Sequence, residues 1–236
     1  MVNYQYSEDI NGTMQKDKSY AAKEEATMMV GKIAVLLAVL VLFVTCDYAA
    51  ADCKAGDRYE DNRNGAVTDC RTGLVWLKNA NCAAPSTPLN GVTNSGTGLN
   101  WKDAMKWVAG LYGDGSGPSV CTLSDGSSAG DWRLPTKTEW MAMVEYARYT
   151  HSPAFTDPAL TTDAGTAKWS SGAGSSFTNV LSAGYWSSTT VASDNGSAWY
   201  VVMTDGSIAT FYKTSHPYVW PVRGGQAESF GSLRLE

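Results

Sequence analysis

Residues 198–223 read AWYVVMTDGSIATFYKTSHPYVWPVR, and this stretch decides the fold class. Its alternating side chains, rich in aromatic and β-branched types, are typical of strands with one buried face. The Asp-Gly pair at 205–206 lies between two such runs and predicts a hairpin turn. We therefore predict that an antiparallel meander closes the chain. Its expected strands are residues 185–188, 198–203, 208–212 and 218–223.

Upstream of the meander the hydrophobic period becomes that of a helix. Residues 100–111 read NWKDAMKWVAGL, with apolar side chains at helical spacing. Thr136 and Glu139 have the spacing of a capping box, in which each residue hydrogen-bonds the other's backbone N–H. This pattern predicts a second helix that runs to about Tyr149.

Shorter strand signals lie before the first helix. An Asn-Gly turn within residues 59–68 predicts a hairpin, and residues 74–77 predict a short buried strand. Residues 150–184 are rich in Gly, Ser and Thr, which predicts a long surface loop. The pattern therefore predicts one α+β domain over residues 52–236, with two helices packed on short antiparallel sheets. We expect four tryptophans to be buried around its core: Trp132, Trp186, Trp199 and Trp220.

An export signal precedes this domain. Residues 33–44 read IAVLLAVLVLFV, follow Lys32, and are followed by three alanines at 49–51. A charged residue, a short apolar run and a small-residue cleavage site are typical of a secretory signal peptide. We predict a signal peptide over residues 28–51, with cleavage after Ala51. The expected location is the periplasm, the cell surface or the medium, with no membrane span in the mature form.

Two other interpretations of the N-terminal region remain open. In the first interpretation the signal is not cleaved and the apolar run anchors the protein in the membrane. In the second the protein is a lipoprotein that is lipidated at Cys46. Residues 1–27 are polar and mixed in charge, which does not fit a signal peptide. We interpret them as an extension that precedes the true translation start at Met28 or Met29.

Cysteine usage supports export. Four cysteines follow the predicted signal, and an even number in an exported chain predicts disulfides, with three possible pairings. We favour Cys53–Cys70 and Cys82–Cys121, because partners that are near in sequence close loops that can form early. A zinc site is the alternative, but no C-x-x-C pattern occurs and neither histidine lies near a cysteine.

Composition and motifs argue against several classes of function. The net charge is −5, whereas a nucleic-acid-binding protein normally carries a basic face. His151 and His216 could serve a serine nucleophile, but no G-x-S-x-G pattern is present. Glu139 is expected to cap its helix rather than to act as a catalytic acid with Asp131 or Glu145. We predict no enzyme, cofactor or metal, although the Ser-Asp-Gly loop at 124–126 leaves calcium binding open.

Six segments carry a family resemblance in the right order. They resemble the Lcl C-terminal domain family, which implies a C-type-lectin-like fold close to that of formylglycine-generating enzymes. Those enzymes use cysteines late in the chain, and this chain has none after Cys121. Arg133 and Arg223 lie in the shared motifs and are expected to pair with carboxylates or carbonyls. The segments are DNRNGAVTDCRTGLVWLKNANC (61–82), LNWKDAMKWVAGL (99–111), GDWRLPTKTEW (130–140), YWSSTT (185–190), AWYVVMTDG (198–206) and YVWPVRGGQ (218–226).

The C-terminal part also resembles the variable proteins of diversity-generating retroelements, through YVWPVRGGQ followed by SFGSL. That resemblance implies a ligand-binding face within residues 190–217 that is diversified at adenines of the gene. Diversified Asn codons with a fixed pyrimidine never give Lys, Glu, Gln, Met or Trp. The expected ligand-binding positions contain none of these five residue types: Val191, Asp194, Tyr200, Val202, Thr204, Asp205, Ser207, Ala209, Thr210, Phe211, Tyr212, Thr214, Ser215 and His216.

These positions predict a binding surface on the hairpin. Trp199, Val201 and Met203 alternate with Tyr200, Val202 and Thr204, so one set should face the core and the other solvent. Tyr offers stiff amphipathic contact area, as it does in antibody loops. Packing of the aromatic residues across the strands is the simpler alternative.

The expected function is recognition of a protein or glycan ligand by an exported, retroelement-diversified receptor. The alternative is a fixed adhesin or envelope module of the same family, and an enzyme related to formylglycine-generating enzymes comes third.

Overall fold

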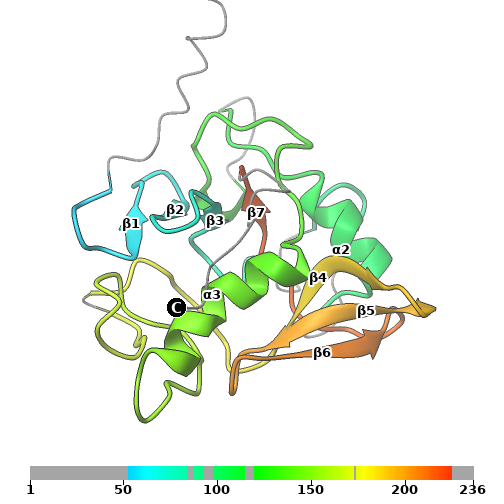
Figure 1. Cartoon of the computed structure of the whole chain (residues 1–236). Coiled ribbons are helices and arrows are strands. Elements are labelled where there is room, and N and C mark those ends of the chain that lie inside the picture. Colours follow the sequence, from blue (N-terminus) through cyan, green and yellow to red (C-terminus); the bar gives the residue numbers. More distant parts are fainter. Residues whose placement is uncertain (1–52, 84–87, 93–97, 115–119, 173, 225–236) are drawn as a thin grey trace, which may run out of the picture. The chain divides into compact units, whose positions relative to one another are not determined.

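Two α-helices and two antiparallel sheets make up the described part of the chain in a computed structural model (Figure 1). The structure describes residues 53–83, 88–92, 98–114, 120–172 and 174–224, all within the compact unit Ala51–Glu236. This layout is the predicted α+β class. The predicted signal peptide and N-terminal extension lie outside the described residues. In chain order the elements are β1 (Tyr59–Asp61), β2 (Ala66–Asp69), β3 (Val75–Leu77), α2 (Trp101–Val108), a 3₁₀ turn (Val120–Thr122), α3 (Lys137–Tyr149), β4 (Gly184–Val191), β5 (Asp194–Val202), β6 (Ser207–Tyr212) and β7 (Val222–Arg223).

The first sheet has the order β1-β2-β3-β7 and begins with the predicted Asn-Gly hairpin. Gly65 has φ +86°, a left-handed conformation that favours glycine. A Cβ at this position would lie 2.6 Å from the carbonyl oxygen of Thr122, so any larger residue would push the 3₁₀ turn away. All four residues of β2, one of the two inner strands of this sheet, are buried.

The last strand differs from its prediction. The meander over β4, β5 and β6 forms as expected, but β7 crosses to the first sheet, where Val222 pairs with Trp76 of β3. Tyr218 keeps only a single bridge to Tyr185 of β4. Pro221 lacks the N–H that a continuous ladder needs, so the predicted strand over residues 218–223 cannot extend along one sheet.

The predicted capping box is present at the start of α3. The Thr136 hydroxyl accepts from the Glu139 N–H (3.2 Å), and the Glu139 carboxylate accepts from the Thr136 N–H (2.7 Å). Arg133 donates to both oxygens of the same carboxylate, at 2.7 and 2.6 Å. Burial raises the pKa of Glu139, but the hydrogen bonds from Arg133 and Thr136 outweigh burial and hold the pKa below its ordinary value. Arg133 therefore has the predicted structural role.

The core is built from aromatic side chains. Trp132, Trp186 and Trp220 are buried as predicted. The prediction for Trp199 is wrong, because this side chain is only half-buried. The ammonium of Lys137, from the first residue of α3, lies 3.6 Å from the centre of its ring. Trp199 therefore lies where the helix meets solvent rather than among core side chains.

Residues 150–184 are irregular, but they are not simply a surface loop. Leu160 and Phe177 are buried, and the ring of Phe177 packs against Trp220 with centroids 5.0 Å apart. The Thr178 N–H donates to the carbonyl of Lys78 (2.9 Å), which ties this segment to the end of β3. The Gly- and Ser-rich composition of the segment did not indicate that these few apolar side chains would be buried.

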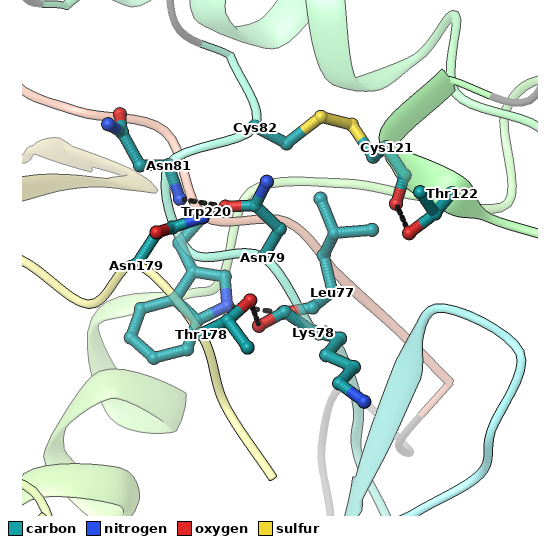
Figure 2. The surroundings of a disulfide bond; sticks show 10 residues. All are labelled: Leu77, Lys78, Asn79, Asn81, Cys82, Cys121, Thr122, Thr178, Asn179 and Trp220. Carbon is teal, nitrogen blue, oxygen red and sulfur yellow. Dashed lines mark hydrogen bonds between the residues drawn. A yellow bond between two sulfur atoms is a disulfide. The ribbon is translucent and has the colours of Figure 1, made fainter. Parts of the chain in front are cut away.

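Both predicted disulfides are present, Cys53–Cys70 and Cys82–Cys121. Figure 2 shows the second bridge near an amide cluster, where Asn179 donates to the side-chain oxygen of Asn79 (3.1 Å). The bridge joins the segment after β3 to the 3₁₀ turn.

Removal of the first bridge should measurably destabilise the domain. The double substitution C53S/C70S frees a loop with a sequence separation of 17 residues. Chain entropy assigns a loop of this length about 3 kcal/mol. Urea unfolding of the oxidised protein and of the double variant measures the difference, and an unchanged midpoint would show that the bridge contributes nothing.

Candidate functional site

The sheet β4-β5-β6 divides its side chains between two faces. Residues directly opposite one another in an antiparallel pair point to the same side. Tyr200 pairs with Ala209 and Ala198 with Phe211, whereas Trp199 pairs with Thr210. Tyr200, Ala209, Ala198 and Phe211 therefore lie on one face of the sheet, and Trp199 and Thr210 lie on the other, which is turned toward α3. We call the face that carries Tyr200 the open face and define it by Tyr200, Val202, Ser207, Ala209 and Phe211.

An aromatic pair dominates the open face. The rings of Tyr200 and Phe211 are stacked, with centroids 5.5 Å apart and planes at 30°. Phe211 is 44% exposed, which is unusual for a large apolar side chain on an edge strand. The Tyr200 ring lies against Gly184, where a Cβ would approach within 2.8 Å of it. The open face therefore holds a preformed aromatic platform.

Two tryptophan residues support this platform: the buried Trp186, on the same face as Tyr200, and the half-buried Trp101 of α2. Trp186 packs edge-on against Tyr200, with centroids 6.4 Å apart, and donates its indole N–H to the carbonyl of Leu99 (2.8 Å). Trp101, the first residue of α2, donates to the carbonyl of Ser187 (2.8 Å). These bonds lock β4 to the start of α2, so Tyr200 rests on a rigid support.

The hairpin turn contributes polar predicted positions. Asp205 is exposed and accepts from the Ser207 N–H (2.8 Å), and hydrogen bonding from Ser207 lowers the pKa of the carboxyl. Thr204 donates to the carbonyl of Ser182 (3.2 Å). Gly206 has φ +71°, as the predicted turn requires, and a Cβ there would lie 2.7 Å from Arg148. The turn therefore carries the charged carboxylate of Asp205 and is fixed by these hydrogen bonds and by close packing against Arg148.

The opposite end of the sheet carries Val191 and Asp194, which pair across the β4–β5 turn. The Asp194 carboxylate accepts from the Ser197 hydroxyl (2.6 Å) and the Gly196 N–H (2.9 Å). These two hydrogen bonds, together with Lys213, lower the pKa of Asp194. The carboxylate of Asp194 is thus charged, and it accepts hydrogen bonds from residues of the β4–β5 turn and the strand that follows.

The loop after β6 lies beside this end of the sheet. Lys213 donates to the hydroxyl of Thr190 (3.1 Å), and its ammonium lies 4.3 Å from the centre of the Trp101 ring. Thr214 and His216 are exposed, and Ser215 is half-buried with its N–H bonded to the carbonyl of Tyr212 (2.8 Å). Thr214 and His216 therefore form a second exposed group, next to Lys213 in the chain.

Two predicted positions on strand β6 do not share the open face. Thr210 pairs with Trp199 and Tyr212 pairs with Ser197, which places both on the side toward α3. The predicted positions on the hairpin are therefore divided between two faces, because consecutive strand residues point to opposite faces. Tyr212 is 67% exposed there, at the edge of the sheet.

Sequence reasoning missed a groove between α3 and the strands β5 and β6. Its walls include Lys137, Met141 and Arg148 from the helix and Trp199 and Ile208 from the sheet. The sequence signal was weak: the helical period leaves Met141 outside the core, whereas the strand period groups Trp199 with the buried Val201 and Met203. No pattern within either segment predicts that the two would meet.

Two residues that the sequence analysis considered for catalysis or calcium binding, His151 and Asp125, have structural partners. No group of three or more His, Cys, Asp or Glu side chains in the described ranges could hold a metal ion. His151 stacks on Phe155 and hydrogen-bonds the carbonyl of Gly165 (3.1 Å), so it has a local structural role. Asp125 of the predicted loop accepts from Arg223 (2.7 Å). Among the residues that the structure describes, no helix is long and apolar enough to cross a membrane.

Comparison with known proteins gives one finding. The family described as the Lcl C-terminal domain matches residues 65–223, which is more than half of the 236-residue chain. The matched range begins at the hairpin glycine and ends with β7, so it contains both helices, the open face and every strand except β1. No curated protein matches the chain.

Proposed function

The chain belongs to the Lcl C-terminal domain family, and from this premise we propose that it is an exported ligand-binding protein whose open face contacts the ligand. The observation that carries the proposal is the half-exposed Tyr200–Phe211 stack on a rigid support. Two disulfides fit an extracellular protein. The finer fold assignment, a C-type-lectin-like domain, rests on the family resemblance.

The character of the open face supports recognition rather than packing. Aromatic anchors supply most of the binding energy at protein interfaces, surrounded by nearly neutral contacts. Here the anchors are Tyr200 and Phe211, and the smaller neighbours Ser207 and Ala209 are half-buried beside them. A monomeric domain rarely exposes such a patch without a partner. A protein or glycan surface is the proposed ligand.

The scaffold residues support the diversified-receptor form of the proposal. Lys213, Trp199 and Met203 are types that diversified Asn codons cannot produce. Met203 is fully buried, Lys213 covers Trp101, and Trp199 contacts Lys137. Residues that diversification cannot reach are therefore those that hold the sheet to the helices.

The alternative function is a fixed adhesin or envelope module with the same open face. The DNA beside the gene separates the two. A reverse-transcriptase gene with a near-copy of the 3′ end that differs at adenines supports the receptor. A locus without these features supports the adhesin. We propose no enzymatic activity, since His151 has structural partners and the chain has no cysteine after Cys121.

Removal of the aromatic pair should abolish binding. The full chain and its Y200A/F211A variant are compared on arrays of bacterial surface proteins and glycans. Loss of two anchors is expected to weaken any specific binding by more than about 30-fold, since an anchor contributes 2 kcal/mol or more. Near-ultraviolet circular dichroism checks that the variant is folded. Unchanged binding by a folded variant would place the ligand site elsewhere.

A further inference from the structure

We propose that the groove between α3 and the strands β5 and β6 is a second binding site, which takes a small carboxylate with an aromatic or other apolar body. The groove has a volume of about 350 Å³, within the range of small-molecule sites. It lies on the face of the sheet opposite the open face. The proposal is therefore independent of the ligand that the open face binds.

The walls of the groove are apolar and aromatic. Trp199 of β5 forms one side, and Met141 and Tyr149 of α3 form the other. Met141 is 46% exposed and Tyr149 is 72% exposed. Within the described ranges, the exposed large hydrophobic residues are these two together with Phe211 and Tyr212 of β6. Half of this set thus borders the groove and offers apolar contact area to a ligand.

Two cations, Lys137 and Arg148, line the same groove without a direct salt bridge to a described carboxylate. Among the described side chains, neither Lys137 nor Arg148 has a carboxylate oxygen within 4.0 Å. The Lys137 ammonium lies over the Trp199 ring, and Arg148 donates one hydrogen bond to the carbonyl of Gly206 (3.2 Å). Both side chains are half-buried, so a carboxylate that reaches them would be partly desolvated.

The remaining polar groups fit a single negative charge. Glu145 also lines the groove, and Asp205 at the adjoining turn offsets part of the Arg148 charge, which leaves Lys137 as the main positive group. In the described part of the chain, no residue accepts a hydrogen bond from the Trp199 indole N–H, which leaves one more donor for a ligand. A monocarboxylate matches this set, whereas a phosphate dianion or a neutral ring leaves charge uncompensated.

The test compares an acid with its neutral amide. The probes are 2-naphthylacetate and 2-naphthylacetamide, titrated into the full chain labelled with ¹⁵N at tryptophan. The indole resonance of Trp199 is assigned from its absence in W199F. We expect a saturable shift of this resonance with the acid and at least tenfold weaker binding of the amide.

Matched lysine variants locate the charge. K137Q should weaken binding of the acid at least about fivefold and leave the amide unchanged. K102Q removes the same charge from the exposed surface of α2 and should change neither. Equal binding of acid and amide to the unaltered protein, shifts confined to other indoles, or no saturable shift would each overturn the proposal. The comparison of acid and amide on the unaltered protein tests the proposal even if K137Q does not fold.

Discussion

Replacement of Trp220 by alanine is expected to lower the free energy of unfolding by about 3–5 kcal/mol. Its side chain is fully buried, and its ring packs against Phe177, Trp76 and Trp140 with centroids 5.0, 5.7 and 5.9 Å apart. Its indole N–H also donates to the carbonyl of Leu77 (2.7 Å). The substitution therefore leaves a large cavity and an unpaired buried carbonyl where the two sheets and α3 meet.

Urea unfolding of W220A and W199A provides the matched comparison. Trp199 is only half-buried, so W199A should lose less than half as much stability as W220A. Similar losses in the two variants would mean that Trp199 belongs to the core after all.

Substitution D69N should have an effect of similar size, about 3–5 kcal/mol, because it leaves a buried charge uncompensated. Arg58 and Asp69 form an ion pair at 2.8 Å, with side chains 3% and 1% exposed. Burial lowers the pKa of Arg58, but Tyr59 and Asp69 raise it above its ordinary value, so the guanidinium stays charged. Its Nε and Nη1 atoms have no hydrogen-bond partner, and among the described carboxylates Asp69 is the one that forms a salt bridge with it.

A partly exposed ion pair is the control for D69N. Lys78 and Asp61 lie 2.6 Å apart, but each side chain is about one-third exposed (33% and 31%). K78Q should therefore cost no more than about 1 kcal/mol. Thermal or urea unfolding measures both variants. If D69N were as mild as K78Q, the Arg58 charge would have to be solvated in the folded protein.

Local sequence signals predicted the local structure well. Thr136 and Glu139 marked the start of α3, because a capping box depends only on residues three apart. The Asn-Gly and Asp-Gly pairs marked two hairpins for the same reason. The disulfide pairing was predictable because both bridges close loops between neighbouring segments.

Long-range structure could not be predicted in the same way. Nothing in residues 218–223 indicates that β7 joins β3, which lies far away in sequence. Phe177 and Leu160 sit in a Gly- and Ser-rich segment whose composition resembles a loop. The groove beside Trp199 depends on where α3 crosses the sheet, a tertiary feature without a sequence period.

Around the candidate site, the sequence predicted the β5–β6 hairpin but combined its two faces. Strict alternation would have separated Phe211 from Thr210 and Tyr212. The register of β5 and β6 makes that separation plain, since Phe211 pairs with Ala198 and Tyr212 pairs with Ser197. The binding role of every predicted position stays a prediction.

The contrast between Phe211 and Tyr212 tests the central claim most directly. The two residues are adjacent and exposed, at 44% and 67%, but lie on opposite faces of the sheet. The measurement is the dissociation constant of F211A and of Y212A for a ligand that the unaltered full chain selects from the arrays. The open-face account predicts a loss of about 30-fold or more for F211A and less than about threefold for Y212A. The reverse order, or equal losses, would contradict it.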